Sequence, residues 1–160
     1  MGLTSYQRAK DLIKEGLSLA HAGKPERARE VFKSSFDVHP TAQAMTYWGW
    51  MEHQLNRTEE AIALCKQAVL MDPEFGNPLN DIGSYLIFQG KFDEAIPWLK
   101  RAIQSKNYEH RHFPHVNLAY IFIEKRMFMK ALRELESALN FLPGDPELVR
   151  KISELRKEIN

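Results

Sequence analysis

Residues 79–86 read Leu-Asn-Asp-Ile-Gly-Ser-Tyr-Leu, and residues 90–102 read Gly-Lys-Phe-Asp-Glu-Ala-Ile-Pro-Trp-Leu-Lys-Arg-Ala. The apolar residues of both segments recur every three or four positions, which predicts two amphipathic helices. Gly90 stands between them and can end the first helix in the left-handed conformation. Gly83 and Ala95 carry little side-chain bulk, so the two helices can approach closely. The segment is therefore predicted to form a helix, a tight turn and a second helix.

The same pattern recurs along the chain. Small residues of the first helices, alanines of the second helices and the residues that close each unit form three independent series. Each series steps by 33, 34 and 36 residues: Gly16, Gly49, Gly83 and Ala119; Ala28, Ala61, Ala95 and Ala131; Pro40, Pro73, Asn107 and Pro143. A spacing shared by three series indicates internal repeats.

This pattern resembles the tetratricopeptide repeat, whose signature is W-x2-L-G-x2-Y, A-x3-F and P at a period of about 34 residues. The resemblance implies an all-α fold, a right-handed α-solenoid that forms one domain over residues 1–160. Four helix-turn-helix repeats are expected at about 9–41, 42–75, 76–109 and 112–145, followed by a capping helix at 145–158. The last segment has a single apolar stripe, as a helix that covers the open end of a stack requires; the stripe consists of Leu148, Ile152 and Leu155.

Several local features refine this expectation. Thr4 and Gln7 can form a capping box, so the first helix is predicted to begin near Ser5. Pro78 and Pro97 are both expected in the first turn of a helix, where amide donors have no intrahelical partner. The two extra residues after the third repeat predict a longer helix or a bulged loop.

Composition and net charge limit the classes of function that the chain can have. The chain has 160 residues, of which 44% are hydrophobic and 27% charged, so it is expected to be a soluble globular protein with one core. A net charge of +1 argues against nucleic acid or an acidic membrane surface as partner. No apolar run approaches the roughly 18 residues of a membrane span, and the N-terminus lacks a signal-like apolar core. The single Cys65 excludes an internal disulfide and suits a cytoplasmic location.

Repeat stacks of this family coil so that their first helices line a concave groove that binds peptides. Carrying over the groove positions gives the predicted partner-binding residues Trp50, His53, Asn77, Asn80, Ser84, Ile87, Phe88, Phe113, Val116, Tyr120 and Ile123. Trp50, Phe88 and Tyr120 are large apolar residues that the fold itself is not expected to bury, and such exposed clusters usually indicate a partner. The alternative is that neighbouring repeats or the capping helix cover them. The amides Asn77 and Asn80 can hold the backbone of an extended peptide, or can simply be solvated.

One subclass of the family binds acidic chaperone tails through a clamp of Lys, Asn and Arg. The matching positions here are Ile13, Leu17, Tyr47, Asn77 and Asp81. Four of the five lack the required amide or cation, and Asp81 would repel a carboxylate. A chaperone-tail adaptor is therefore not expected.

Chemical sites are weakly supported. His110, His112 and His115 are the nearest approach to a metal site, but they are expected in and beside a surface loop without further ligands. Cys65 is expected to be a small packed hydrophobe. Glu52 stands where the family usually has an apolar residue, and solvent, a basic neighbour and looser packing all stay open.

We find no Gly-rich phosphate loop, no carboxylate pair in a shared pocket and no Ser, His and Asp set, so neither an enzyme nor a cofactor is expected. The sequence thus predicts a non-catalytic adaptor or scaffold that binds a peptide or helix of a partner protein. The alternative is a self-assembling scaffold whose groove takes a segment of another copy.

Overall fold

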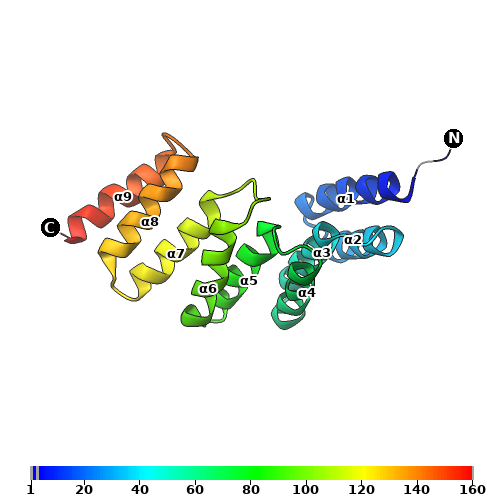
Figure 1. The fold of residues 1–160 in the computed structure, drawn as a ribbon, viewed down its shortest axis with the longest axis horizontal. Coiled ribbons are helices and arrows are strands. Elements are labelled where there is room, and N and C mark those ends of the chain that lie inside the picture. The colour runs from blue at the N-terminus through cyan, green and yellow to red at the C-terminus, as the bar shows by residue number, and fades with distance from the viewer. Residues whose placement is uncertain (1, 3, 160) are drawn as a thin grey trace.

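The structure is a computed structural model that describes residue 2 and residues 4–159. Within these residues the chain forms nine helices: α1 (Ser5–His21), α2 (Pro25–Val38), α3 (Ala42–Gln54), α4 (Thr58–Met71), α5 (Gly76–Phe88), α6 (Phe92–Gln104), α7 (His112–Glu124), α8 (Phe128–Phe141) and α9 (Pro146–Ile159). They follow one another along the long axis, and the two chain ends lie at opposite ends of the stack (Figure 1). The prediction of an all-α repeat solenoid is confirmed. Residues 1, 3 and 160 of the predicted domain lie outside the described part.

Small residues on the first helices let each hairpin close. A Cβ atom added at Gly16 would lie 2.5 Å from Cε1 of Phe32, and one added at Gly83 would meet the Leu99 side chain. These contacts join α1 to α2 and α5 to α6. The close approach predicted from the glycine series is therefore present in the structure.

One residue of each hairpin turn has a positive φ angle. These residues are Gly23 (φ 69°), Asn56 (62°), Gly90 (73°) and Arg126 (57°), in chain order. Glycine adopts this conformation without steric cost and asparagine tolerates it, whereas a bulky residue is strained there. The geometry of the turn is thus kept even where the sequence departs from glycine, at Arg126.

The predicted start of α1 is confirmed, since the Thr4 side chain caps the helix by accepting a hydrogen bond from the amide of Gln7 at 3.1 Å. The expectation for Pro97 was wrong. Pro97 is the sixth residue of α6 and lies inside the helix. Its ring nitrogen cannot donate to the carbonyl of Asp93, but both residues are exposed, so water can satisfy that carbonyl.

The extra residues of the third repeat lie in the loop, because α6 already ends at Gln104. This loop, residues 105–111, is tied to the segment that precedes α5. The amide of Asn107 donates to the carbonyl of Glu74 at 2.9 Å, and the amide of Gly76 donates to the carbonyl of Asn107 at 2.9 Å. The loop is therefore held against the start of α5.

The surroundings of Glu52, which the sequence left open, and of Cys65, predicted to be a packed hydrophobe, can now be described. Glu52 is buried, and its carboxylate accepts hydrogen bonds from Trp48 Nε1 at 2.9 Å and Arg57 Nη1 at 3.2 Å. Of solvent, a basic neighbour and looser packing, the structure therefore shows a basic neighbour of Glu52, namely Arg57. Cys65 is fully buried, and burial raises the pKa of its thiol well above the usual value. It is a packed core residue.

The hydrophobic core is not uniform along the stack. Its largest cluster extends from α4 to α9, whereas Phe32 and Met51 belong to a separate, smaller cluster near α1 and α2. At the C-terminal end α9 buries Leu148, Ile152 and Leu155 against the preceding helices, as predicted for a capping helix.

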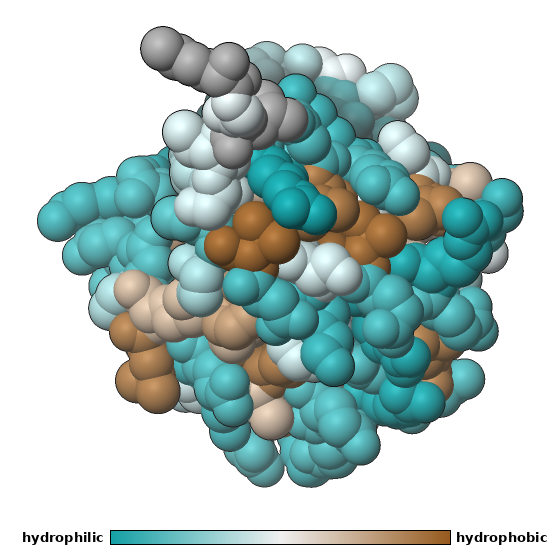
Figure 2. Space-filling view, turned by 90° about the vertical axis from the view of Figure 1, so that its right-hand side faces the viewer, coloured by the Kyte–Doolittle hydropathy of each residue, from teal (hydrophilic) through white to brown (hydrophobic). Residues whose placement is uncertain are grey.

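The opposite end of the stack is formed by α1 and α2. Figure 2 faces this end and shows a strip of apolar residues running between polar ones. Among the described residues, no helix is both long and apolar enough to cross a membrane.

Candidate partner-binding groove

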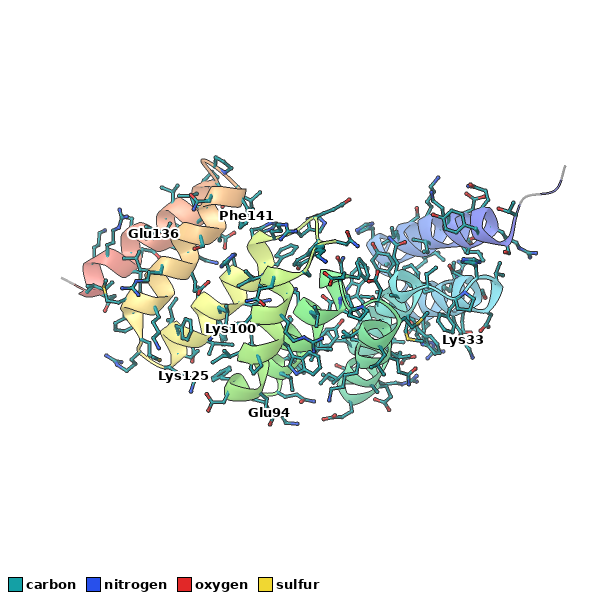
Figure 3. The ribbon with its side chains drawn as sticks, viewed as in Figure 1. Lys33, Glu94, Lys100, Lys125, Glu136 and Phe141 are labelled. Carbon is teal, nitrogen blue, oxygen red and sulfur yellow. The ribbon has the colours of Figure 1, made fainter. Side chains whose placement is uncertain are left out.

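The eleven predicted groove residues lie on α3, α5 and α7. These are first helices of successive hairpins, and α5 contacts both α3 and α7. The three helices are therefore neighbours in the order α3, α5 and α7, and Figure 3 shows the side chains along the stack.

A cavity of about 840 Å³ lies on this surface, in the C-terminal half of the molecule. Four of the predicted residues line it together, namely Ile87 of α5 and Val116, Tyr120 and Ile123 of α7. The opposite wall comes from α8 and α9 and includes Phe128, Leu135 and Leu155. The cavity, which we call the α7 groove, thus has mostly apolar walls.

Phe88 lies next in sequence to Ile87 and is 69% exposed. Its ring is nearly perpendicular to that of His53 of α3, with ring centroids 5.0 Å apart, and the His53 ring in turn lies 4.5 Å from that of Tyr85. Burial lowers the pKa of His53, which favours the neutral imidazole. Phe88 and His53 therefore form an aromatic surface where α3 meets α5.

Tyr120 projects from the middle of α7 and is 47% exposed. Its ring contacts Phe92 of α6 in an edge-to-face arrangement at 6.2 Å. Tyr120 and Phe88 thus keep large uncovered surfaces, as expected from the sequence.

Trp50 behaves differently. It is only half-buried, but it packs against the cluster of Phe32 and Met51 and lies 6.5 Å from Tyr47 and 6.4 Å from His21, measured between ring centroids. The expectation that the fold leaves Trp50 uncovered was therefore wrong. The reason is that the aromatic run of α3 faces α1 and α2, where Trp50 fills space beside Phe32.

Asn80 is 7% exposed, and its side-chain carbonyl accepts a hydrogen bond from Nδ2 of Asn117 at 3.0 Å. This bond joins α5 to α7. The oxygen of Asn80 is therefore engaged within the fold, where it fixes the relative position of the two groove helices. Ser84, one turn further along α5, is half-buried.

A second cavity, of about 570 Å³, is lined by Asn77. It lies between Gln43 and Tyr47 of α3 and the 105–111 loop. We call it the loop cavity. Of the predicted groove residues, four thus line the α7 groove, Asn77 lines the loop cavity, and the others line neither.

Phe113 lines neither cavity. It is exposed at the start of α7, where its ring lies 4.2 Å from His112 and 5.5 Å from His110. Burial and the charge of His110 lower the pKa of His112. His115 stands apart from both, because its Nδ1 lies 2.7 Å from Glu134 Oε2 and its ring stacks on Phe141.

Sequence reasoning missed the contribution of α9 to the α7 groove. Besides Leu155, the charged residues Lys151, Glu154 and Glu158 line it. Their spacing of three and four residues places them on one helix face, which is a usable signal. The sequence did not reveal that this face lies opposite Tyr120.

Comparison with known proteins supports the repeat assignment. Profiles of the tetratricopeptide repeat match residues 13–76 and 79–107, together more than half of the chain. A comparison with curated proteins finds no match.

Similar solved structures include PilF of Pseudomonas aeruginosa, with a TM-score of 0.86 and 21% identity over 96% of this chain and 70% of that one. PilW, described as a widely conserved type IV pilus biogenesis factor, has a TM-score of 0.82 and 14% identity over 94% and 70%. MamA has a TM-score of 0.69 and 19% identity over 83% and 77%. At these identities the likeness concerns the fold.

Proposed function

Since the chain belongs to the tetratricopeptide repeat family, we propose that it is a non-catalytic interaction module that binds a segment of a partner protein in the α7 groove. An adaptor or scaffold role follows from this proposal. Protein–protein binding is the general use of such repeat stacks, whose curvature creates extended concave surfaces.

One observation carries the proposal. Tyr120, which is 47% exposed, lines a cavity of about 840 Å³ together with Ile87, Val116 and Ile123, and Phe88, next in sequence to Ile87, is 69% exposed. Contiguous apolar surface of this kind on a soluble protein usually marks an interaction site, and aromatic residues are enriched among binding hot spots.

The walls of the groove indicate the chemistry of the segment. Its centre is apolar, while its rim carries charges of both signs, including Glu124, Lys151 and Glu154. An apolar centre inside a polar rim is the usual anatomy of a protein interface. A peptide or helix with two or three apolar anchors fits this arrangement better than a highly charged one.

Selection of binders from a random peptide library on the immobilised chain tests the proposal. Phe88→Ala and Tyr120→Ala should each weaken binding of the selected peptides by about 2 kcal/mol. Leu70→Ala is the matched control, because Leu70 is 83% exposed on α4 and neither lines the α7 groove nor adjoins a lining residue, as Phe88 adjoins Ile87. Peptides that bind both aromatic variants as tightly as the parent would place the site elsewhere.

The salt dependence of binding and the oligomeric state of the protein in solution give two further tests. Binding should change little with ionic strength, because the groove centre is apolar and the charges of the rim are of both signs. The alternative, in which the groove takes a segment of another copy, requires the chain to associate with itself. A monomer over a wide concentration range in sedimentation would exclude that alternative.

Cytoplasmic location belongs to the same proposal. It rests on the use of a single cysteine, Cys65, whose thiol is buried in the core. Fractionation of cells that make the protein tests it directly.

A further inference from the structure

The residues that line the loop cavity carry more positive than negative charge. Lys106 and Arg111 are cations, Glu109 is the only carboxylate among the described lining residues, and His110 adds a positive charge when it is protonated. With His110 neutral, two cations against one carboxylate leave the lining with a net charge of +1. The loop cavity therefore favours an anion that carries a single negative charge.

Arg111 is held at the cavity wall by neutral groups. Its Nη2 atom donates to the backbone carbonyls of Ser105 and Lys106 at 2.9 and 3.1 Å, and its Nη1 atom donates to that of Ile103 at 3.4 Å. Among the described residues, no ion pair includes Arg111. The half-buried guanidinium is thus fixed in position without being neutralised. Such a cation binds an anion with little further loss of conformational freedom.

Lys106 can turn towards an anion at little cost. Its Nζ atom lies 3.6 Å from the carboxylate of Glu74, but both side chains are exposed. Exposed ion pairs of this kind contribute little to stability, so the lysine can exchange one carboxylate for another. Glu109 forms no ion pair with Lys106 or Arg111 in the described part of the chain. Lys106 is therefore available as a second counter-charge.

The 105–111 loop, which forms one wall of the cavity, is packed against the start of α5. A Cβ atom added at Gly76 would meet the side chains of Ser105 and Tyr108, so the close approach of the loop depends on this glycine. The two backbone hydrogen bonds of Asn107 hold the loop in the same position. Tyr108 itself is buried and lines the cavity. The cavity is therefore formed by the fold and does not need a ligand to shape it.

One face of α5 connects the loop cavity to the α7 groove. Asn77 lines the loop cavity, and Ile87 lines the α7 groove. Asn80 and Ser84 lie between them at steps of three and four residues, so all four belong to one helix face. The ten residues from Asn77 to Ile87 correspond to about 15 Å along the helix. A partner segment that follows this face can reach both cavities, with its two contacts about four or five residues apart if the segment is extended.

We propose that the loop cavity binds one acidic side chain, an aspartate or a glutamate, of the partner segment. Arg111 and Lys106 supply the counter-charge, and the side-chain amides of Asn77 and Gln43 donate hydrogen bonds to the carboxylate. Both cations belong to the 105–111 loop and not to the chaperone-clamp positions of the first helices, which hold no cation here. The volume of about 570 Å³ is ample for one such side chain. This subsite rests on the proposed function only in assigning the carboxylate to a groove-bound segment.

The cavity itself is tested with a probe that does not depend on the partner. The α-methylamide of N-acetyl-glutamic acid is titrated into the isotopically labelled full chain, and the side-chain amide signals of Gln43 and Asn77 are followed by NMR. We expect saturable shifts, with an affinity that falls by about tenfold or more in Arg111→Gln because a fixed, half-buried cation is lost. The exposed Lys106 contributes less, so Lys106→Gln should weaken binding by about two- to threefold. Glu109→Gln should strengthen binding by a similar factor, since it removes the opposing charge from the lining.

Two controls keep this result specific. The glutamine analogue of the probe has nearly the same shape without the charge and should not bind. Lys91→Gln is matched to Lys106→Gln, because Lys91 is also exposed and also pairs with an exposed glutamate, Glu59. Lys91 precedes α6, at the opposite end of that helix from the 105–111 loop (Figure 1), so the variant should bind the probe as the parent does.

Three outcomes would contradict the proposal. One is the absence of a saturable shift in the parent. Another is unchanged affinity in both Lys106→Gln and Glu109→Gln, which leave the hydrogen bonds of Arg111 in place and so do not disturb the loop. The third concerns inorganic phosphate, which should bind no more tightly than the probe because the lining matches one negative charge. Phosphate that binds far more tightly would overturn the assignment to a carboxylate side chain.

Peptide selection links the cavity to the groove. Peptides selected from a library that is fused at both ends, and so has no free terminal carboxylate, should share an Asp or Glu at one position. The same selection on Arg111→Gln should lose that preference. Selected peptides without a shared acidic residue would overturn the assignment to a partner segment and leave the proposed groove function intact. If the glutamate probe binds but no peptide is ever selected, the cavity stands and the proposed groove function fails.

Discussion

At the residue scale, Asp81 places burial and charge in direct conflict. Its folded-state pKa is about 7 against an ordinary value of 3.8, so the folded protein holds this proton more tightly than the unfolded chain does. Below about pH 4 both states are protonated and there is no penalty. Between about pH 4 and pH 7 only the unfolded state is ionised, so the free energy of unfolding falls as pH rises, and above pH 7 the full penalty persists.

Asp81→Asn should therefore stabilise the protein at pH 8 and leave its stability nearly unchanged at pH 4. The difference between the two pKa values corresponds to at most about 4 kcal/mol, and partial exposure of Asp81 reduces the expected gain to about 1–2 kcal/mol. Urea unfolding across this pH range measures it. A gain of equal size at every pH would contradict the role assigned to the charge.

Gly83 tests the packing inside a hairpin. A Cβ atom at this position would meet the Leu99 side chain, so Gly83→Ala should overpack the contact between α5 and α6. The cost of about 1–3 kcal/mol outweighs the roughly 1 kcal/mol that alanine gains over glycine within a helix. Unfolding free energies of Gly83→Ala, Leu99→Ala and the double variant check this. The double variant should lose less stability than the two single variants together, because alanine at position 99 leaves room for the Cβ atom at position 83.

Single residues differ in how well the sequence predicts them. Gly83 could be identified because three independent series repeat its spacing. The bond between Asn80 and Asn117 could not, since the partners are 37 residues apart and an asparagine on a helix gives no sign of whether it meets solvent, a peptide or another amide. Trp50 was misjudged because its position suggests the groove, while its contacts with Tyr47 and His21 depend on how α3 faces the first hairpin.

At the element scale, α6 lacks one of its backbone hydrogen bonds because it contains a proline. Pro97 is exposed within the helix and leaves the carbonyl of Asp93 without its intrahelical partner. Proline in a helix interior costs about 3 kcal/mol. Because the position lies early in α6 and faces solvent, we expect Pro97→Ala to stabilise the protein by about 1–2 kcal/mol. Thermal unfolding measures the gain, and a variant that melts below the parent would show that the ring makes a contact essential to α6.

The capping helix carries a prediction of its own. Deleting the chain from Asp145 onward uncovers the surface that Leu148, Ile152 and Leu155 bury. Terminal repeats need a polar outer face, so the truncated protein should melt at lower temperature and aggregate more readily. As a control, Arg150→Ala alters only the exposed side of α9 and should behave as the parent does. A truncated chain with unchanged melting would mean that α9 packs without supporting the stack.

The sequence predicted α9 and its apolar stripe, because the stripe has helical spacing. It did not predict that Lys151, Glu154 and Glu158 line the α7 groove. Which exposed face of a terminal helix borders a concave surface depends on the rotation between successive hairpins. That rotation is set by many contacts between helices and leaves no periodic mark in the sequence.

At the scale of the whole molecule, the repeats are regular but the core is not. One cluster of buried residues joins α4 to α9, whereas the first two helices depend mainly on Phe32, Ala28 and Met51. In a repeat stack each hairpin contacts only its neighbours, so stability is distributed locally along the chain. The hairpin of α1 and α2 should therefore open more easily than the C-terminal half.

Native-state hydrogen exchange can measure this difference. Amides of α1 and α2 should exchange with lower opening free energies than those of α5 to α8, because local unfolding of an end hairpin exposes less buried apolar surface. Phe32→Ala should enlarge the gap, since it removes a fully buried ring at a cost of about 3–5 kcal/mol. Leu99→Ala is the matched core substitution in the third hairpin. It should lower protection across the C-terminal half, because Leu99 lies within the large cluster. If Phe32→Ala lowers protection equally in all nine helices, the stack unfolds as one cooperative unit and the division of the core has no energetic consequence.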